Sequence, residues 1–210
     1  RNDSLCVMPL NSITLGGLEI KVMRIVLIRH GRPAVDSRKW MTSFEFGQWI
    51  DSYNAAELCD SVQPPNELFQ LVQNCNSVVC SNLHRSLSSA KRLEIKETKI
   101  IRDHQFREME MPWGRLSGLK LKPNYWSIIF RLLWVAGYSK NSESFKDATL
   151  RARQAALTLE SLAKKKRSVL FVGHGMLNRA IAESLVKRGW ETKRKLSGNY
   201  WGVGVFEREG

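Results

Sequence analysis

Short apolar runs alternate along the chain with longer amphipathic stretches. Two of the runs are alike: RIVLIRHG at residues 24–31 and SVLFVGHG at residues 168–175. Each has the length of a strand and is rich in β-branched residues, a pattern typical of a strand buried on both faces of a parallel sheet. Each ends at a His-Gly pair. Because α/β sheets bind ligands beyond the carboxyl ends of their strands, His30 and His174 are predicted to lie where such a sheet carries its chemistry.

The rest of the pattern predicts an alternation of strands and helices. Further strands are predicted at residues 77–80, 99–102 and 202–207. Helices are predicted at residues 42–58, 64–73, 83–93, 125–135, 144–166 and 176–187. Right-handed crossovers between parallel strands would place these helices on both faces of the sheet. The pattern therefore predicts a layered α/β domain with a mainly parallel sheet.

Composition limits the class of protein. The chain has 210 residues, 43% of them hydrophobic, which suits one domain with a substantial core. No apolar run is long enough to span a bilayer, so we expect no membrane partner. The net charge of +13 raises the question of nucleic acid, but the basic residues are dispersed and no recognition motif accompanies them. We therefore expect a solvated basic surface that favours anionic substrates, and no nucleic-acid partner.

Residues 1–22 have no clear period and lack the hydrophobic core of a signal peptide. We expect an N-terminal extension there and a single catalytic domain over residues 23–210.

The four cysteines (Cys6, Cys59, Cys75 and Cys80) form no C-x-x-C pair, so neither a zinc site nor a disulfide framework is predicted. A disulfide between Cys75 and Cys80 stays open, although nothing in the sequence favours it. A reducing, cytoplasmic location is the expectation.

Arg29, His30 and Gly31 combine residue types suited to phosphoryl chemistry. The guanidinium of Arg29 offers a planar fork of donors to phosphate oxygens. The neutral imidazole of His30 can attack phosphorus as a covalent nucleophile, and the adjacent positive charge favours that neutral form. Gly31 lets the chain turn sharply or lets a ligand approach the backbone. Taken alone, an R-H-G turn is more often structural.

Two other strand ends point to the same chemistry. His174 precedes a predicted helix whose free N–H groups attract an anion, although a core histidine bonded to a backbone carbonyl is the alternative. The segment VVCSNLHRSLSSAKRL, residues 78–93, brings Arg85 toward the same edge. One such arginine is commonly a surface charge. Two arginines and two histidines at one edge predict a phosphate pocket, because a phosphoryl group in transfer spreads its charge over its oxygens.

Together with two further segments, these motifs resemble the histidine phosphatase superfamily, with its phosphoglycerate mutase-like fold. Five motifs occur in that family's order between about Met23 and the C-terminus. They are RHG at 29–31, an S-x-L-x-R-S-x-x-S-A segment at 81–90, FREMEMPWG at 106–114, Glu143-Ser144 followed by Arg151, and GHG at 173–175. The resemblance implies a three-layer α/β/α sandwich and a reaction through a phosphohistidine that needs no metal and no organic cofactor.

The resemblance also implies roles for the residues at matching positions. His30 is implied as the nucleophile, and Arg29, Arg85 and His174 as the groups that bind the phosphoryl oxygens, with His174 also part of the catalytic set. A bound phosphate ion is therefore expected between them. His84 and His104 match no role and are expected to be partly exposed structural residues.

Glu108 takes the place of the family's proton donor, which would protonate the leaving oxygen and then activate water. Glu110 is the alternative donor, because Met111-Pro112 stands where relatives have a glycine. Arg32 and Glu143 are expected on the substrate side. Asp36 occupies a position where many relatives have an asparagine, and we expect its carboxylate to point away from bound phosphate.

The preferred interpretation is a metal-independent phosphatase that hydrolyses a phosphorylated small molecule or a phosphoprotein. Phosphoglycerate mutase-type transfer is the enzyme alternative. A catalytically silent module that binds phosphate or a phosphoprotein is the alternative without catalysis. Residues 113–141 are expected to form a short lid, whose bulky apolar side chains either meet a hydrophobic leaving group or pack onto the sheet. Three basic residues of this region are candidate contacts to an anionic substrate: Lys120, Lys122 and Arg131.

Overall fold

The computed structural model of the chain describes residues 13–15, 18–20, 22–116 and 118–210. Most of the expected extension at residues 1–22 lies outside these described residues. Within it, β1 (Ile13–Leu15) and β2 (Leu18–Ile20) pair as a small antiparallel sheet that the sequence pattern did not predict. Across the described ranges, no helix combines the length and the apolar character needed to cross a membrane.

A six-stranded sheet forms the centre of the molecule, with the strand order β5-β4-β6-β3-β8-β7. Its members are β3 (Val22–Arg29), β4 (Ser77–Ser81), β5 (Ile100–Asp103), β6 (Ser168–Gly173), β7 (Glu191–Arg194) and β8 (Val203–Glu209). Strands β3 to β6 run parallel to one another, whereas β8 is antiparallel to β3 and β7 is antiparallel to β8. The predicted, mainly parallel sheet is confirmed.

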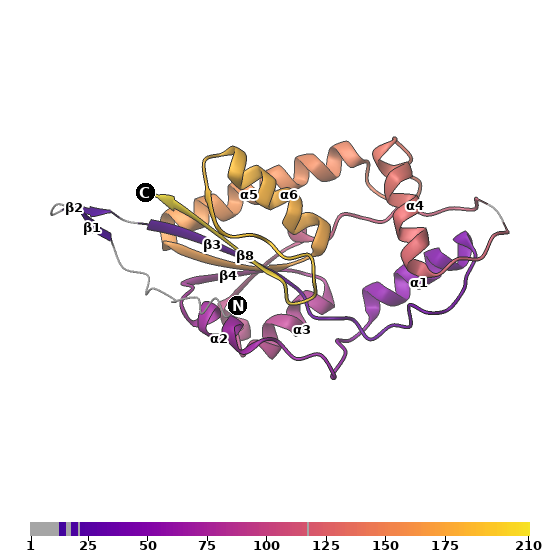
Figure 1. Cartoon of the computed structure of the whole chain (residues 1–210), viewed down its shortest axis with the longest axis horizontal. Helices are drawn as coiled ribbons and strands as arrows, with labels where there is room; N and C mark the ends of the chain where they lie inside the picture. The colour runs from indigo at the N-terminus through magenta and orange to yellow at the C-terminus, as the bar shows by residue number, and fades with distance from the viewer. Residues whose placement is uncertain (1–12, 16–17, 21, 117) are drawn as a thin grey trace, which may run out of the picture.

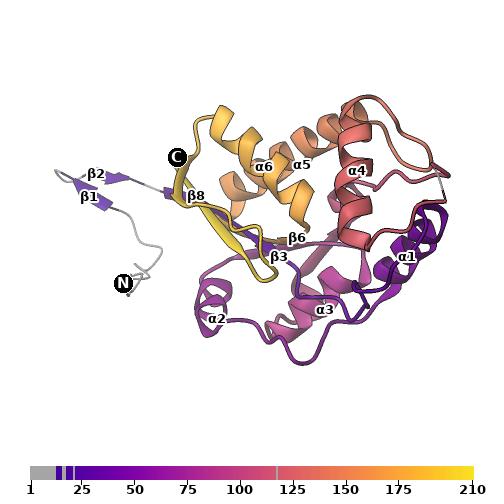
Figure 2. The same ribbon diagram turned by 45° about the vertical axis from the view of Figure 1, so that its right-hand side comes forward.

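Helices cover both faces of this sheet (Figures 1 and 2). On one face lie α5 (Phe145–Lys166) and α6 (Gly175–Lys187), and on the other lie α2 (Asn66–Gln73) and α3 (His84–Arg92). Alternate side chains of β3 serve the two cores: Ile25 and Leu27 pack with α5 and α6, and Val26 and Ile28 pack with α2 and α3. This double burial explains why the strand is an unbroken apolar run. The three-layer α/β/α sandwich is confirmed.

A smaller unit lies beyond the carboxyl ends of the parallel strands (Figure 2). It consists of α1 (Ser43–Ala55) and α4 (Pro123–Val135). The two helices share an apolar cluster of their own that includes Phe46, Trp126 and Phe130. The indole N–H of Trp126 donates to the Met41 carbonyl oxygen at 2.8 Å, which ties α4 to the segment before α1. A second core therefore holds two helices beside the edge where α/β sheets bind ligands.

Some predicted boundaries were wrong. The edge strand β7 was not predicted because its sequence, ETKR, has no apolar alternation, and it is held by its pairing with β8. The helix predicted to reach residue 58 ends at Ala55, because Ala56 has extended backbone. Two short 3₁₀ helices, η1 (Glu97–Lys99) and η2 (His104–Phe106), flank β5. Cys75 and Cys80 are both free thiols, so no disulfide joins them.

Candidate active site

His30 follows β3 directly, and its ring is only 1% exposed. Its Nδ1 atom lies 2.7 Å from the carbonyl oxygen of Gly31. Since a carbonyl oxygen can only accept, Nδ1 carries the proton and donates, which leaves the lone pair on Nε2. Burial, followed by the positive charges of Arg85 and Arg29, lowers the pKa of His30 well below its usual value. The site therefore contains a neutral imidazole in one fixed tautomer.

His174 follows β6 and lies beside His30 because β3 and β6 pair in register. Arg29 is opposite Gly173 in that pairing, and the two imidazole rings meet edge to face with their centroids 5.2 Å apart. His174 is fully buried, and neither of its ring nitrogens has a hydrogen-bond partner among the described residues. The alternative of a core histidine bonded to a backbone carbonyl is therefore wrong. Buried polar groups are normally paired, so this ring is available to a ligand atom.

The electrostatics of His174 resemble those of His30. Burial, followed by the charge of Arg85, lowers the pKa of His174 well below its usual value. A neutral imidazole always keeps one N–H, so His174 can donate one hydrogen bond to an anionic oxygen without itself carrying a charge. Its position at the start of α6 adds the partial positive charge of a helix N-terminus.

Arg85 connects the nucleophile candidate to α1. It lies in the first turn of α3 and is buried, so the interpretation as a surface charge does not apply. Its Nε donates to His30 Nε2 at 3.3 Å, and its Nη1 donates to Asn54 Oδ1 at 3.0 Å. The guanidinium also lies over the ring of Tyr53, 5.1 Å from its centroid. These contacts hold the planar fork of donors next to His30.

Arg29 approaches the same place from β3. Its guanidinium stacks on the ring of Tyr200, 4.2 Å from the centroid, and donates to the carbonyl oxygen of Gly198. A Cβ atom on Gly175 would come within 3.3 Å of Arg29 Nε, so the missing side chain makes room for the guanidinium at the start of α6. Arg29 Nε is buried without a hydrogen-bond partner among the described residues. It is therefore a second donor available to a ligand.

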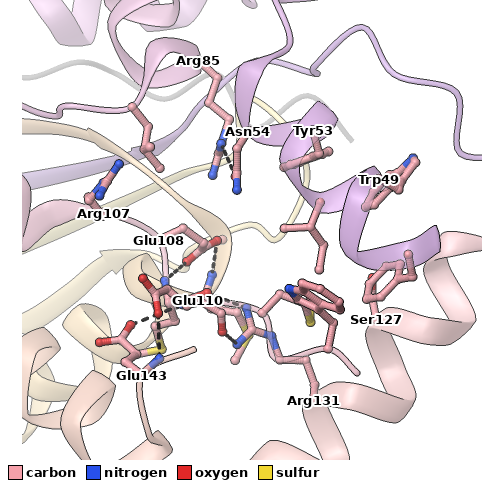
Figure 3. Close-up of a pocket in the computed structure, with 18 of the residues that line it drawn as sticks. Trp49, Tyr53, Asn54, Arg85, Arg107, Glu108, Glu110, Ser127, Arg131 and Glu143 are labelled. Carbon is pink, nitrogen blue, oxygen red and sulfur yellow. Dashed lines mark hydrogen bonds between the residues drawn. The ribbon is translucent and has the colours of Figure 1, made fainter. Parts of the chain in front are cut away.

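Glu108 lies on the segment after η2, and Figure 3 shows it in the same cavity as Arg85. Its carboxylate accepts from the backbone N–H of Met176 at 3.2 Å and from that of Leu177 at 3.0 Å, both in the first turn of α6. A carboxylate is stabilised at a helix N-terminus, which explains its fixed position. It also accepts from the N–H of Met109 at 3.0 Å. Glu108 thus lies on the lining of the same cavity as Arg29 and Arg85.

Glu110 and Glu143 are engaged with each other's backbones (Figure 3). Glu110 accepts from the N–H of Glu143 at 2.7 Å, and Glu143 accepts from the N–H of Glu110 at 3.3 Å. Glu143 also forms an ion pair with Arg151, whose Nη1 binds the carbonyl oxygens of Gln105 and Arg107 at 2.8 Å. Both carboxylates line the cavity, but their bonds shape the segment that carries Glu108. Glu110 and Glu143 are thus engaged in this network, and the choice of Glu108 as proton donor stays a prediction.

Other predicted residues lie elsewhere. Arg32 is exposed and is not part of the cavity lining, because the chain turns away after Gly31 and its carbonyl oxygen accepts from the N–H of Cys59 at 2.7 Å. Asp36 is exposed and accepts hydrogen bonds from Arg38, so its carboxylate points away from the phosphate site as expected. His84 is half exposed and near Glu57.

One cavity of about 950 Å³ joins these groups. Its lining includes Arg29, Arg85 and Glu108 together with residues of α1 and α4. His30 and His174 are not on its surface. His30 is buried directly behind two lining residues, since its ring lies 3.3 Å from Arg85 and 5.7 Å from the centroid of Tyr200.

Sequence reasoning missed several lining residues. Tyr53 of α1 and Tyr200 of the loop before β8 meet through their hydroxyl groups at 3.4 Å, above the two arginines. Asn54, which holds Arg85, was not predicted, and His104 lines the cavity although no role was expected for it. No local motif marks such residues, because each is brought here by tertiary contacts.

In the part of the chain that the structure describes, no three His, Cys, Asp or Glu side chains group in a way that could hold a metal ion.

Comparison with known families agrees with this geometry. Residues 25–210 match the model of the histidine phosphatase superfamily (branch 1). The chain belongs to the histidine phosphatase superfamily. No curated protein sequence matches it.

Three solved structures illustrate the similarity in fold. The product of a Mycobacterium tuberculosis open reading frame has a TM-score of 0.58 and 19% identity, covering 90% of this chain and 95% of that one. A phosphoserine phosphatase mutant from Entamoeba histolytica, in complex with phosphoserine, has a TM-score of 0.54 and 18% identity, covering 89% and 94%. A mycobacterial glucosyl-3-phosphoglycerate phosphatase has a TM-score of 0.51 and 20% identity, covering 79% and 80%. At these identities the likeness establishes the fold.

Proposed function

We propose that this member of the histidine phosphatase superfamily hydrolyses phosphomonoesters through a covalent phosphohistidine on Nε2 of His30. The observation that carries the proposal is the tautomer of His30, whose Nδ1 donates to Gly31 and whose Nε2 lone pair faces Arg85. Nucleophilic attack requires a neutral ring with that lone pair, and burial together with two arginines favours the neutral ring. The phosphatase names of related structures agree with this reaction class.

In the first step, Nε2 of His30 attacks phosphorus while the bond between phosphorus and the ester oxygen breaks. The Nε donor of Arg85 exchanges its bond to Nε2 for a phosphoryl oxygen, and Arg29 and His174 donate to the other oxygens. These donors are in place before charge develops, which is the condition for effective electrostatic stabilisation. Glu108, in its protonated form, gives its proton to the leaving oxygen, and the alcohol departs.

In the second step, the Glu108 carboxylate takes a proton from a water molecule whose oxygen attacks phosphorus. The bond between phosphorus and Nε2 breaks, phosphate leaves and His30 returns to its neutral form. Glu108 ends with the proton that the next cycle needs, so the charges and protons balance. Two guanidinium groups and one imidazole N–H stabilise the phosphoryl group, and no step is assigned to a metal or a cofactor.

The substrate is proposed to be a phosphorylated small molecule. Residues 113–141, expected to act as a short lid, include α4, which lines the cavity together with α1. The cavity is much larger than a phosphate ion, and ligand sites of about 300–1,000 Å³ hold molecules of metabolite or drug size. The part of the substrate beyond its phosphate is therefore expected to lie against the residues of α1 and α4 that line the cavity.

Release of nitrophenol from p-nitrophenyl phosphate tests the proposal. We expect His30→Ala to lose at least about a thousandfold in kcat, because the variant lacks the nucleophile. His84→Ala is the matched control, since His84 is half exposed and paired with Glu57 outside the cavity lining. Equal losses in both variants, or activity retained in His30→Ala, would contradict the proposed role of His30.

A further inference from the structure

Helix α4 is apolar on two opposite faces. Trp126, Phe130 and Trp134 are buried on one of them, the first two in the shared cluster with α1. Three residues on the other face remain largely exposed: Ile128 at 58%, Leu132 at 68% and Val135 at 60%. Their spacing of four and three residues places them in one stripe along the helix. A helix that is apolar on both faces normally has a partner on each.

The exposed stripe belongs to the cavity that holds the phosphate-binding arginines. All three residues line it, and Trp49 of α1 and Met111 contribute further apolar surface. We call these five residues the apolar wall: Trp49, Met111, Ile128, Leu132 and Val135. Figure 3 shows Trp49 and the α4 residue Ser127 across the cavity from Arg107 and Glu108. The cavity therefore has charged side chains, among them Arg107 and Glu108, at one end and apolar side chains at the other.

The charged groups near the wall do not favour a second anionic group. Arg131, the one basic residue of α4, donates to the carbonyl oxygens of Glu110 at 2.7 Å and Met109 at 2.6 Å, so its donors are engaged by backbone. Arg131 was predicted as a contact to an anionic substrate, but its guanidinium is already bound to these backbone oxygens. Four acidic residues also line the cavity: Asp51, Glu108, Glu110 and Glu143. Arg107 and Arg179 line the cavity as well, so the charged part of the lining is mixed in sign and does not by itself select a second anionic group.

We propose that the substrate is a phosphomonoester of a large apolar alcohol, such as a long alkyl or polycyclic aryl group. The phosphate would bind between Arg29 and Arg85, and the apolar alcohol would cover the wall. This inference rests on the proposed function and adds the chemical class of its leaving group. A substrate that binds through its phosphate would place its alcohol group in the same cavity, where it would cover the exposed stripe. Burying the alcohol removes apolar surface from water on both sides.

Phosphate release from ethyl, butyl, hexyl and octyl phosphate tests the inference. The series changes the apolar area while the leaving oxygen stays the same. We expect kcat/KM to rise by about two- to fourfold for each methylene that reaches the wall, since full burial of one methylene corresponds to about fourfold. We expect Leu132→Asn to lower the octyl-to-ethyl ratio by about three- to tenfold. Leu157→Asn is the matched control, because Leu157 is an exposed leucine of α5 outside the cavity.

Each outcome distinguishes the inference from the proposed function. Equal kcat/KM along the series would overturn the apolar leaving group and leave the phosphatase standing. Hydrolysis of p-nitrophenyl phosphate but of none of the alkyl esters would overturn the apolar leaving group alone, whereas hydrolysis of neither would overturn the proposed function and the substrate class with it. If Leu132→Asn and Leu157→Asn reduce the chain-length preference equally, the apolar wall does not bind the alkyl group. Sedimentation of both variants tests whether a second copy of the chain covers the stripe instead. If Leu132→Asn dissociates a dimer and leaves the octyl-to-ethyl ratio of kcat/KM unchanged, the stripe is a dimer contact and the inference is wrong.

Discussion

The Nε atom of Arg85 donates to the Nε2 atom of His30 across 3.3 Å. On the other side of the ring, Nδ1 of His30 donates to the carbonyl oxygen of Gly31 at 2.7 Å. The imidazole is therefore held by one donor and one acceptor, and both fix the same tautomer. Arg85 occupies the lone pair that would attack phosphorus, so it has to exchange this nitrogen for a phosphoryl oxygen when a substrate binds.

Replacing Arg85 by lysine should separate charge from geometry. Lysine keeps the positive charge but lacks the planar fork that spans His30 and Asn54. We expect Arg85→Lys to lower kcat by about a hundred- to a thousandfold, the usual effect of losing one preorganised donor to a transferring group. Steady-state kinetics on p-nitrophenyl phosphate measures it. Arg102→Lys, in an exposed ion pair with Glu97, is the control, and a similar loss there would refute the assignment.

The pH profile should reflect the lowered pKa of His30. As pH falls through that pKa, protonation removes the Nε2 lone pair and activity is lost. Because burial and the charges of Arg85 and Arg29 place the pKa below the ordinary value of 6.5, we expect the nucleophile to remain active down to pH values below about 6.5. The dependence of kcat/KM on pH, which reports the groups of the free enzyme, checks this. An acid limb centred above pH 6.5 would show that His30 is not shielded as the structure indicates.

The choice between Glu108 and Glu110 as proton donor can be decided by two variants. Glu108 lies at the start of α6, whereas Glu110 is bonded to the backbone N–H of Glu143. We expect Glu108→Gln to lower kcat on alkyl phosphates by about a hundred- to ten-thousandfold, the usual contribution of general acid catalysis. The effect on p-nitrophenyl phosphate should be smaller, because nitrophenolate needs less protonation to leave. If Glu110→Gln shows this leaving-group dependence and Glu108→Gln does not, the roles are reversed.

Removal of metal ions should leave the reaction unchanged. Arg29, Arg85 and His174 are proposed to donate to the phosphoryl oxygens, so the proposed steps do not require a bound cation. We expect the rate of p-nitrophenyl phosphate hydrolysis after dialysis against EDTA to equal the untreated rate. Recovery of a lost rate on adding a divalent cation would require a different mechanism.

The sequence predicted the catalytic edge well because its rules there are local. A strand buried on both faces must be an unbroken apolar run, and two such runs that pair in register place His30 next to His174. Arg85 followed from the same strand-turn-helix pattern. Arg29, His30, Arg85 and His174 lie together as predicted, whereas their roles in phosphate binding and catalysis stay predictions.

The rest of the site depends on contacts that no local pattern encodes. Tyr53 and Tyr200 are 147 residues apart in sequence and meet only in the folded chain. Arg32 was expected in the site because it follows His30 and Gly31, but the backbone bond from Cys59 directs the chain away. The second apolar face of α4 could not be assigned from periodicity alone, since a helix that is apolar all round gives no single direction of burial.

Trapping the phosphoenzyme tests the central claim most directly. The wild-type chain, His30→Ala and His84→Ala are each mixed with a ³²P-labelled phosphomonoester and quenched without acid. Phosphohistidine is stable to base and labile to acid, so we expect such a label on the wild type and on His84→Ala and none on His30→Ala. Label retained by His30→Ala, or hydrolysis by the wild type without any trapped label under rapid quench, would contradict a covalent intermediate on His30.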